Sequence, residues 1–139
     1  MSWIGYPWLA SAELPESAKS CERELGSHDV VVRLRQTEAS KARANSVPLA
    51  YAMVSTQGGK YASLLWDAVQ SEAKEKQISS STLLGYSVVH EIGHCLLGPE
   101  HSSAGMMRAG WTRRDARDMD QMRLMFSRSE AQKITARLR

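Results

Sequence analysis

The sequence has little of several features that mark particular protein classes. Its 139 residues include only two cysteines, Cys21 and Cys95, which excludes a scaffold built on disulfides. No apolar run approaches the ~18–20 residues that a membrane helix needs. The net charge of +3 is too weak by itself to indicate nucleic-acid binding. The N-terminus lacks the basic and apolar regions of a signal peptide, so a cytoplasmic location is the default, and secretion requires a start further upstream.

The overall composition is that of a globular protein. Hydrophobic residues make up 42% of the chain and charged residues 24%, both near the average for soluble domains. A chain of this length suits one domain with a real core. Residues 1–139 are therefore predicted to form a single domain, whose oligomeric state the sequence leaves open.

Strand-like segments occupy the first half of the chain. Residues 3–9 are an irregular candidate, whereas residues 29–35 are rich in β-branched side chains and give the clearest strand. Residues 49–54 and 61–66 flank the pair Gly58-Gly59 and predict a strand, a turn and a second strand. These segments together predict a small mixed sheet.

Helical patterns dominate the second half. Residues 67–77 have helical composition. A second helix is expected to start at Ser79-Ser80-Ser81-Thr82, which are good N-cap residues, and to end at Gly98. One face of this second helix is apolar, with Leu84, Val88, Ile92, Cys95 and Leu96. A later core-facing stripe is expected from Met119, Met122, Met125 and Phe126. Ile134 and Leu138 suggest a final short helix, and the fold class is α+β.

The second helix carries the sequence His90-Glu91-Ile92-Gly93-His94, an H-E-x-x-H pattern. Two histidines four residues apart lie on one helical face, with Cβ atoms roughly 5–6 Å apart, so one Zn²⁺ ion can bind both. Glu91 lies beside the metal and is placed to act as a general base on water. Because Gly98 ends the helix, the chain can bring His101 back towards the same ion.

The segment from His90 to His101 resembles the zinc-binding consensus of the metzincin metallopeptidases, H-E-x-x-H-x-x-G-x-x-H. The loop from Ser102 to Arg108 resembles the approach to their Met-turn. The block over residues 83–111 is similar to small bacterial metzincin-like proteins.

The resemblance implies a zincin-type fold and a zinc-dependent peptidase. His90, His94 and His101 would be the ligands of one zinc ion, Glu91 the catalytic base, and Met107 the hydrophobic floor beneath the metal. The family also implies an edge strand that binds an extended peptide, and residues 61–66 match it best by position. The expected partner is a peptide or protein substrate, with neither nucleic acid nor a membrane involved.

The sequence departs from the consensus in two places. Leu97 is an extra residue, so Glu100 rather than His101 stands at the consensus position of the third ligand. We still expect His101 to be the ligand, because a loop beyond the helix end can absorb one residue and the spacing from Gly98 to His101 is kept. Ala109 stands where some metzincins carry a tyrosine.

Other interpretations stay open from the sequence. The main alternative is a non-catalytic zinc-binding module, although such a site has no need of a base at Glu91. Cys95 is expected to be a small buried hydrophobe, and the aspartates of the C-terminal part, among them Asp115, to be solvated helix charges. The domain is also expected to be short at its N-terminus, which would leave apolar sheet surface uncovered.

Overall fold

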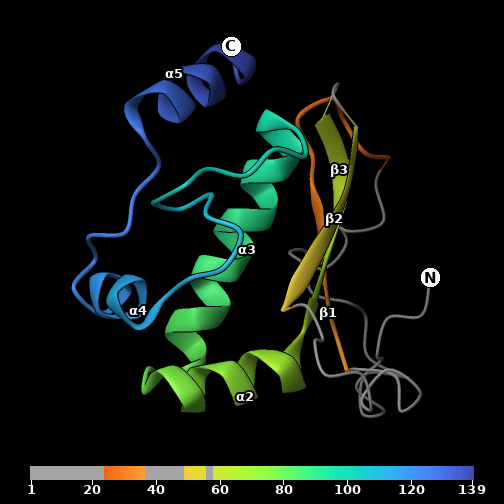
Figure 1. The fold of residues 1–139 in the computed structure, drawn as a ribbon. Coiled ribbons are helices and arrows are strands. Elements are labelled where there is room, and N and C mark those ends of the chain that lie inside the picture. Colours follow the sequence, from red (N-terminus) through yellow and green to blue (C-terminus); the bar gives the residue numbers. More distant parts are fainter. Residues whose placement is uncertain (1–23, 37–48, 56–57) are drawn as a thin grey trace, which may run out of the picture.

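The computed structural model describes residues 24–36, 49–55 and 58–139, in which four helices accompany a three-stranded sheet. In chain order the elements are β1 (Val31–Arg35), β2 (Ala50–Ser55), β3 (Gly58–Leu65), α2 (Trp66–Lys76), α3 (Ser80–Leu97), α4 (Arg113–Asp120) and α5 (Arg128–Arg137). This mixed α+β architecture confirms the predicted class (Figure 1). The candidate strand at residues 3–9 and Cys21 lie outside the described residues.

The sheet has the order β1-β3-β2, with β1 parallel and β2 antiparallel to β3. The predicted mixed sheet and the predicted pairing of residues 49–54 with 61–66 are thus confirmed. The expectation that residues 61–66 form an edge strand is wrong, because β3 lies in the middle and pairs on both sides. The prediction rested on the fact that residues 61–66 lead directly into the helices, but this does not determine strand order. β1 pairs in parallel with β3 on the side away from β2, so β3 is the central strand.

One face of the sheet packs against α3. Ala62 and Leu64 of β3 are 2% and 1% exposed on this face. Val32 and Leu34 of β1 share the face through the register with Ala62 and Leu64 but remain 36% and 50% exposed. The reason is that α3 packs mainly against β2 and β3. Apolar surface on β1 is therefore not covered by the described residues.

The helix α3 forms the middle layer of the molecule. In Figure 1 the sheet lies on one side of α3, while α4 and α5 lie on the other and α2 crosses one end. A core cluster joins α2, α3, α4 and the segment after α4, and its buried members are Val69, Ala73, Ile78, Leu83, Ala116, Met119 and Leu124. Across the described ranges, no helix is both long enough and apolar enough to span a bilayer.

The C-terminal part differs from the predicted methionine stripe. Met119 is fully buried, but α4 ends at Asp120, and Met122 and Met125 are 80% and 65% exposed. Met122 has a φ of 56°, which interrupts the helical path. Recurrence every three or four residues shows which face a helix would bury, but not that the helix continues. The predicted final helix is confirmed as α5.

Candidate metal centre

Two caps fix the ends of α3. At its start, the side chain of Ser79 accepts a hydrogen bond from the backbone N–H of Thr82 at 3.1 Å, as the sequence predicts. At its end, Gly98 has a φ of 101°, a conformation that glycine adopts without strain, and donates its N–H to the carbonyl of His94. The chain therefore leaves the helix four residues after His94.

The structure brings the three predicted histidines together. His90 and His94, 8% and 6% exposed, lie one turn apart on α3, and His101 approaches them from the loop beyond Gly98. The Nε2 atom of His94 lies 3.1 Å from the Nε2 of His90 and 3.1 Å from that of His101. Three imidazole nitrogens thus converge on one point.

Backbone carbonyls hold two of the imidazole rings. The Nδ1 of His90 lies 2.7 Å from the carbonyl oxygen of Met106, and the Nδ1 of His94 lies 2.9 Å from that of Gly98. A carbonyl oxygen only accepts, so Nδ1 carries the proton in both rings and Nε2 keeps its lone pair. This is the arrangement in which a histidine presents Nε2 to a metal ion.

Desolvation lowers the pKa of His90 and of His101. Desolvation lowers the pKa of His90 to about 4, against a weaker opposing effect of its hydrogen bond to Met106. Desolvation also lowers the pKa of His101, with the charge of a protonated His94 acting in the same direction. Neutral imidazoles with converging lone pairs are a donor set for a cation. His90, His94 and His101 could therefore hold a metal ion.

Glu91 is buried and directly follows His90 in the sequence. Its side chain is 5% exposed, and its Oε2 atom has no hydrogen-bond partner in the structure. Desolvation by burial raises the pKa of this carboxyl to about 7. An unpartnered buried oxygen costs about 1–3 kcal/mol or more, so fold stability does not explain its position.

The loop after His101 packs against α3 at a glycine. Met107 is 1% exposed, and a Cβ atom on Gly93 would lie 2.5 Å from its sulfur and 3.1 Å from Cε1 of Phe126. Gly93 lies between the two ligand-bearing turns of α3, so Met107 packs on the helix directly beside the histidine pair. The role of Met107 as the floor beneath a metal ion stays a prediction.

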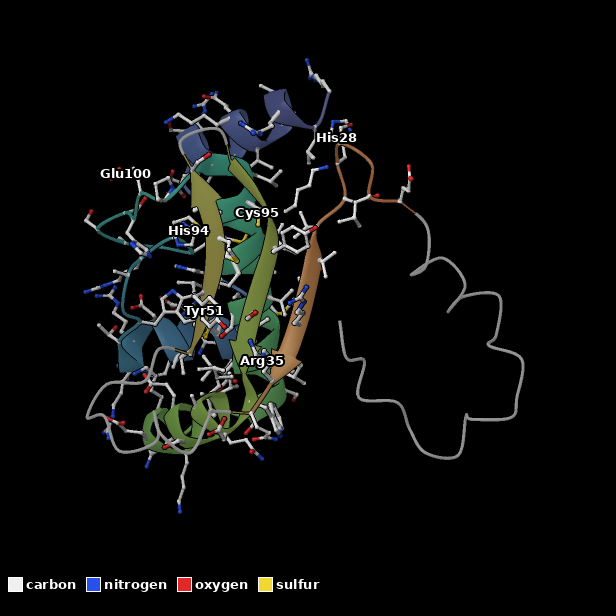
Figure 2. All side chains as sticks on the ribbon, turned by 90° about the vertical axis from the view of Figure 1, so that its right-hand side faces the viewer. His28, Arg35, Tyr51, His94, Cys95 and Glu100 are labelled. Atoms are coloured by element: carbon white, nitrogen blue, oxygen red, sulfur yellow. The ribbon has the colours of Figure 1, made fainter. Side chains whose placement is uncertain are left out.

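Glu100 does not join the cluster. Its side chain is exposed, and the group of potential ligands in the described ranges comprises His101 and the two helical histidines. Figure 2 shows His94 and Cys95 on α3 behind the sheet, and Glu100 on the loop beyond the β2 edge. Leu97, the extra residue, is the last of α3, so the additional residue is absorbed before Gly98 turns the chain.

Two further predictions have clear outcomes. Cys95 is a buried thiol, 2% exposed, as expected, and burial raises its pKa. The prediction of a solvated charge is wrong for Asp115, which is 8% exposed. Its carboxylate accepts from the N–H of Thr112 at 2.7 Å in a capping box and lies 3.5 Å from Arg108.

Sequence reasoning missed the contact between Ser102 and Glu130. The hydroxyl of Ser102, the residue after His101, donates to Oε1 of Glu130 on α5. The pattern Ser127-x-x-Glu130 is a capping-box signature and could have placed Glu130 at the start of a helix. No pattern in the sequence indicates that the same carboxylate reaches the loop of the third histidine.

Comparison of this chain with models of protein families, with curated proteins and with solved structures finds no match. The metzincin resemblance therefore stays a prediction that depends on the motif at residues 83–111.

Proposed function

We propose that this protein is a zinc-dependent peptidase. The observation that carries the proposal is the buried and unpartnered Oε2 of Glu91, one residue after a histidine whose Nε2 belongs to a three-nitrogen cluster. A centre that only stabilised the fold would not require a desolvated carboxyl there.

The donor set fits zinc. At the usual Zn–N distance of ~2.0–2.1 Å, two ligands of a tetrahedral ion lie about 3.3–3.4 Å apart. The two Nε2 separations of 3.1 Å in the structure are close to this value. Three protein ligands also leave one tetrahedral position for a reactant, which distinguishes catalytic from structural zinc sites.

The proposed chemistry divides between the ion and the protein. Bound zinc supplies a Lewis acid that polarises a carbonyl and makes water more acidic. Glu91 accepts a proton from the attacking water at Oε2 and later delivers it to the leaving amine. With its pKa raised to about 7 by burial, this carboxyl can both take and release a proton near neutral pH.

The edge of the sheet supports a peptide as substrate. Within the described residues, the side of β2 that faces away from β3 pairs with no strand. In Figure 2 this edge lies on the side of the loop that carries Glu100, whereas β1 forms the opposite edge. An extended peptide can add to such an edge through backbone hydrogen bonds.

The test is the variant Glu91→Gln. It should bind one zinc ion per chain, as the wild type does, because Glu91 is not a ligand. Its rate of casein hydrolysis should fall by about 10²–10⁴-fold, because the general base is lost. Metal content by elemental analysis and hydrolysis by release of soluble peptides measure the two properties on the same samples.

Full activity in Glu91→Gln would contradict the mechanism. A wild type that binds one zinc ion but cleaves no unfolded protein, with all coordination positions filled by the chain, would instead show a zinc-binding module. A wild type that binds no zinc would contradict both functions.

A further inference from the structure

His101 differs from the other two histidines in how its ring is held. Within the described part of the chain, its Nδ1 has no carbonyl partner comparable to Met106 O for His90 or Gly98 O for His94. Its side chain is also exposed, whereas theirs are buried. The ring contacts those of His90 and His94, and without a carbonyl to hold Nδ1 its position also depends on the backbone that carries it.

That backbone is fixed at the next residue. The N–H of Ser102 donates to the carbonyl of Met107 at 2.9 Å, which closes the loop on itself. The hydroxyl of Ser102 donates to Oε1 of Glu130, a residue 28 positions further along the chain. One residue thus joins the third histidine both to the loop and to α5.

The acceptor is an ionised carboxylate in a defined place. Glu130 is only 9% exposed, and its second oxygen accepts from the N–H of Ser127 at 2.7 Å in the capping box of α5. Burial by itself would raise the pKa of Glu130, but the hydrogen bonds from Ser102 and Ser127 outweigh it and hold the pKa below its usual value. Both oxygens are therefore committed acceptors at neutral pH.

The same C-terminal segment holds the other end of the loop. The N–H of Met106 donates to the carbonyl of Met125 at 2.9 Å. Gly105 has a φ of 79°, and a Cβ atom there would lie 2.8 Å from that same carbonyl oxygen. The loop is thus attached on both sides of Gly105. Ser102 binds Glu130 in the first turn of α5, and Met106 binds Met125, which precedes α5.

We propose that Glu130 is a positioning residue for His101, acting through Ser102. The inference rests on the metal centre proposed above and adds the element that orders its third ligand. Without the Ser102–Glu130 bond, the loop that carries His101 would become ordered only when the metal binds. The cost of that ordering would lower the affinity of the protein for the metal ion. Partners that orient ligands in this indirect way typically account for 10–100-fold in metal affinity, and we expect about tenfold here.

The experiment measures metal binding to the full chain. Ser102→Ala removes the hydroxyl but leaves both bonds between Ser127 and Glu130. Ser102→Thr keeps a hydroxyl and should restore binding. Ser127→Ala is the control, because it removes a helix cap without touching Ser102. Zn²⁺ affinity by chelator competition is paired with the visible spectrum of the Co²⁺-loaded protein, which reports the number and geometry of the ligands.

We expect Ser102→Ala to bind Zn²⁺ about tenfold more weakly and to change the Co²⁺ spectrum, with wild-type behaviour in Ser102→Thr and Ser127→Ala. Glu130→Gln, which keeps an amide oxygen for the N–H of Ser127, should weaken binding in the same direction and provides a second reading if Ser102→Ala folds poorly.

Three results would overturn the inference. Wild-type affinity and spectrum in both Ser102→Ala and Glu130→Gln would leave the zinc centre standing but remove the role of Glu130. Equal losses in Ser102→Ala and Ser127→Ala would assign the effect to the stability of α5. A wild type that binds neither Zn²⁺ nor Co²⁺ would overturn the metal centre, and this inference with it.

Discussion

The two halves of the proposed metal centre are built in different ways. His90 and His94 belong to one helix, are buried, and each donate Nδ1–H to a backbone carbonyl. His101 belongs to a loop, is exposed, and depends on Ser102 and Glu130 for its place. The spacing of the helical half follows from the period of an α-helix, and a loop residue, Met106, supplies the carbonyl that holds the ring of His90. The loop half needs residues about 30 positions away in the sequence.

The comparison shows which part of such a centre is local. The four-residue spacing on α3 places the two helical histidines on one face of the helix. The position of a loop ligand depends on tertiary contacts, so it is open to change by substitutions far from the metal.

Replacing a histidine of either half should greatly weaken zinc binding. His94→Ala and His101→Ala should each lose about 10²–10³-fold in affinity, roughly one ligand's share of the binding free energy. The metal-free proteins should differ, however. His94→Ala leaves the buried carbonyl of Gly98 without its partner and should lose about 1–3 kcal/mol of unfolding free energy. His101→Ala, at an exposed side chain, should change it by less than about 0.5 kcal/mol.

The matched control is Glu100→Ala, next to the loop ligand and exposed. It should bind zinc as the wild type does in chelator competition. Loss of zinc from Glu100→Ala with retention in His101→Ala would show that the loop half has been assigned to the wrong residue.

The pH dependence of the metal-free protein should reveal the cost of burying Glu91. Its folded pKa of about 7 lies above the ordinary 4.5, so the folded state holds the proton more tightly than the unfolded chain. The stability that this proton contributes is present below pH 4.5 and is lost as the pH rises through 7. Glu91→Gln should therefore be more stable than the wild type by about 2–3 kcal/mol at pH 8, and equal to it at pH 4.

Urea denaturation of the chelator-treated proteins at both pH values gives this difference directly. Using the variant as reference removes the opposite effect of His90, whose pKa is lowered to about 4 and which destabilises the fold as the pH falls from 6.5 towards 4. A wild type as stable as Glu91→Gln at pH 8 would contradict a desolvated carboxyl at this position.

The packing of Met107, in the loop, against α3 should give two glycine-to-alanine substitutions on this helix opposite effects on the free energy of unfolding. Gly93→Ala places a Cβ atom 2.5 Å from the sulfur of Met107 and should destabilise the protein by about 1–2 kcal/mol in spite of the better helix propensity of alanine. Gly85→Ala meets nothing within 4 Å and should stabilise it by up to ~1 kcal/mol. Thermal or urea unfolding measures both; the same sign in both variants would mean that Met107 does not pack on α3 as described.

The sequence predicted what depends on short-range patterns. The helix from Ser79 to Gly98, the pairing of β2 with β3, and the histidine pair all follow from spacing and caps. The position of β3 within the sheet did not, because strand order depends on where β1 returns. Met122 also shows the limit: its spacing from Met119 is helical, yet the chain turns at a positive φ and exposes it.

The contacts that hold the loop half could not be predicted from the sequence either. The capping pattern at Ser127 and Glu130 predicts a helix start, but the bond to Ser102 exists only because α5 packs beside the loop. His101 was predicted as the third ligand because a loop tolerates an extra residue before it, and the structure brings it to the cluster while leaving Glu100 exposed.

The most direct test of the account is the coordination sphere of the zinc-loaded protein, determined by crystallography with anomalous scattering at the zinc edge. We predict one zinc ion bound by the Nε2 atoms of His90, His94 and His101, with a non-protein ligand in the remaining position and Glu91 outside the coordination sphere. A carboxylate oxygen of Glu100 or Glu91 on the metal, or a fourth ligand from the chain, would contradict it.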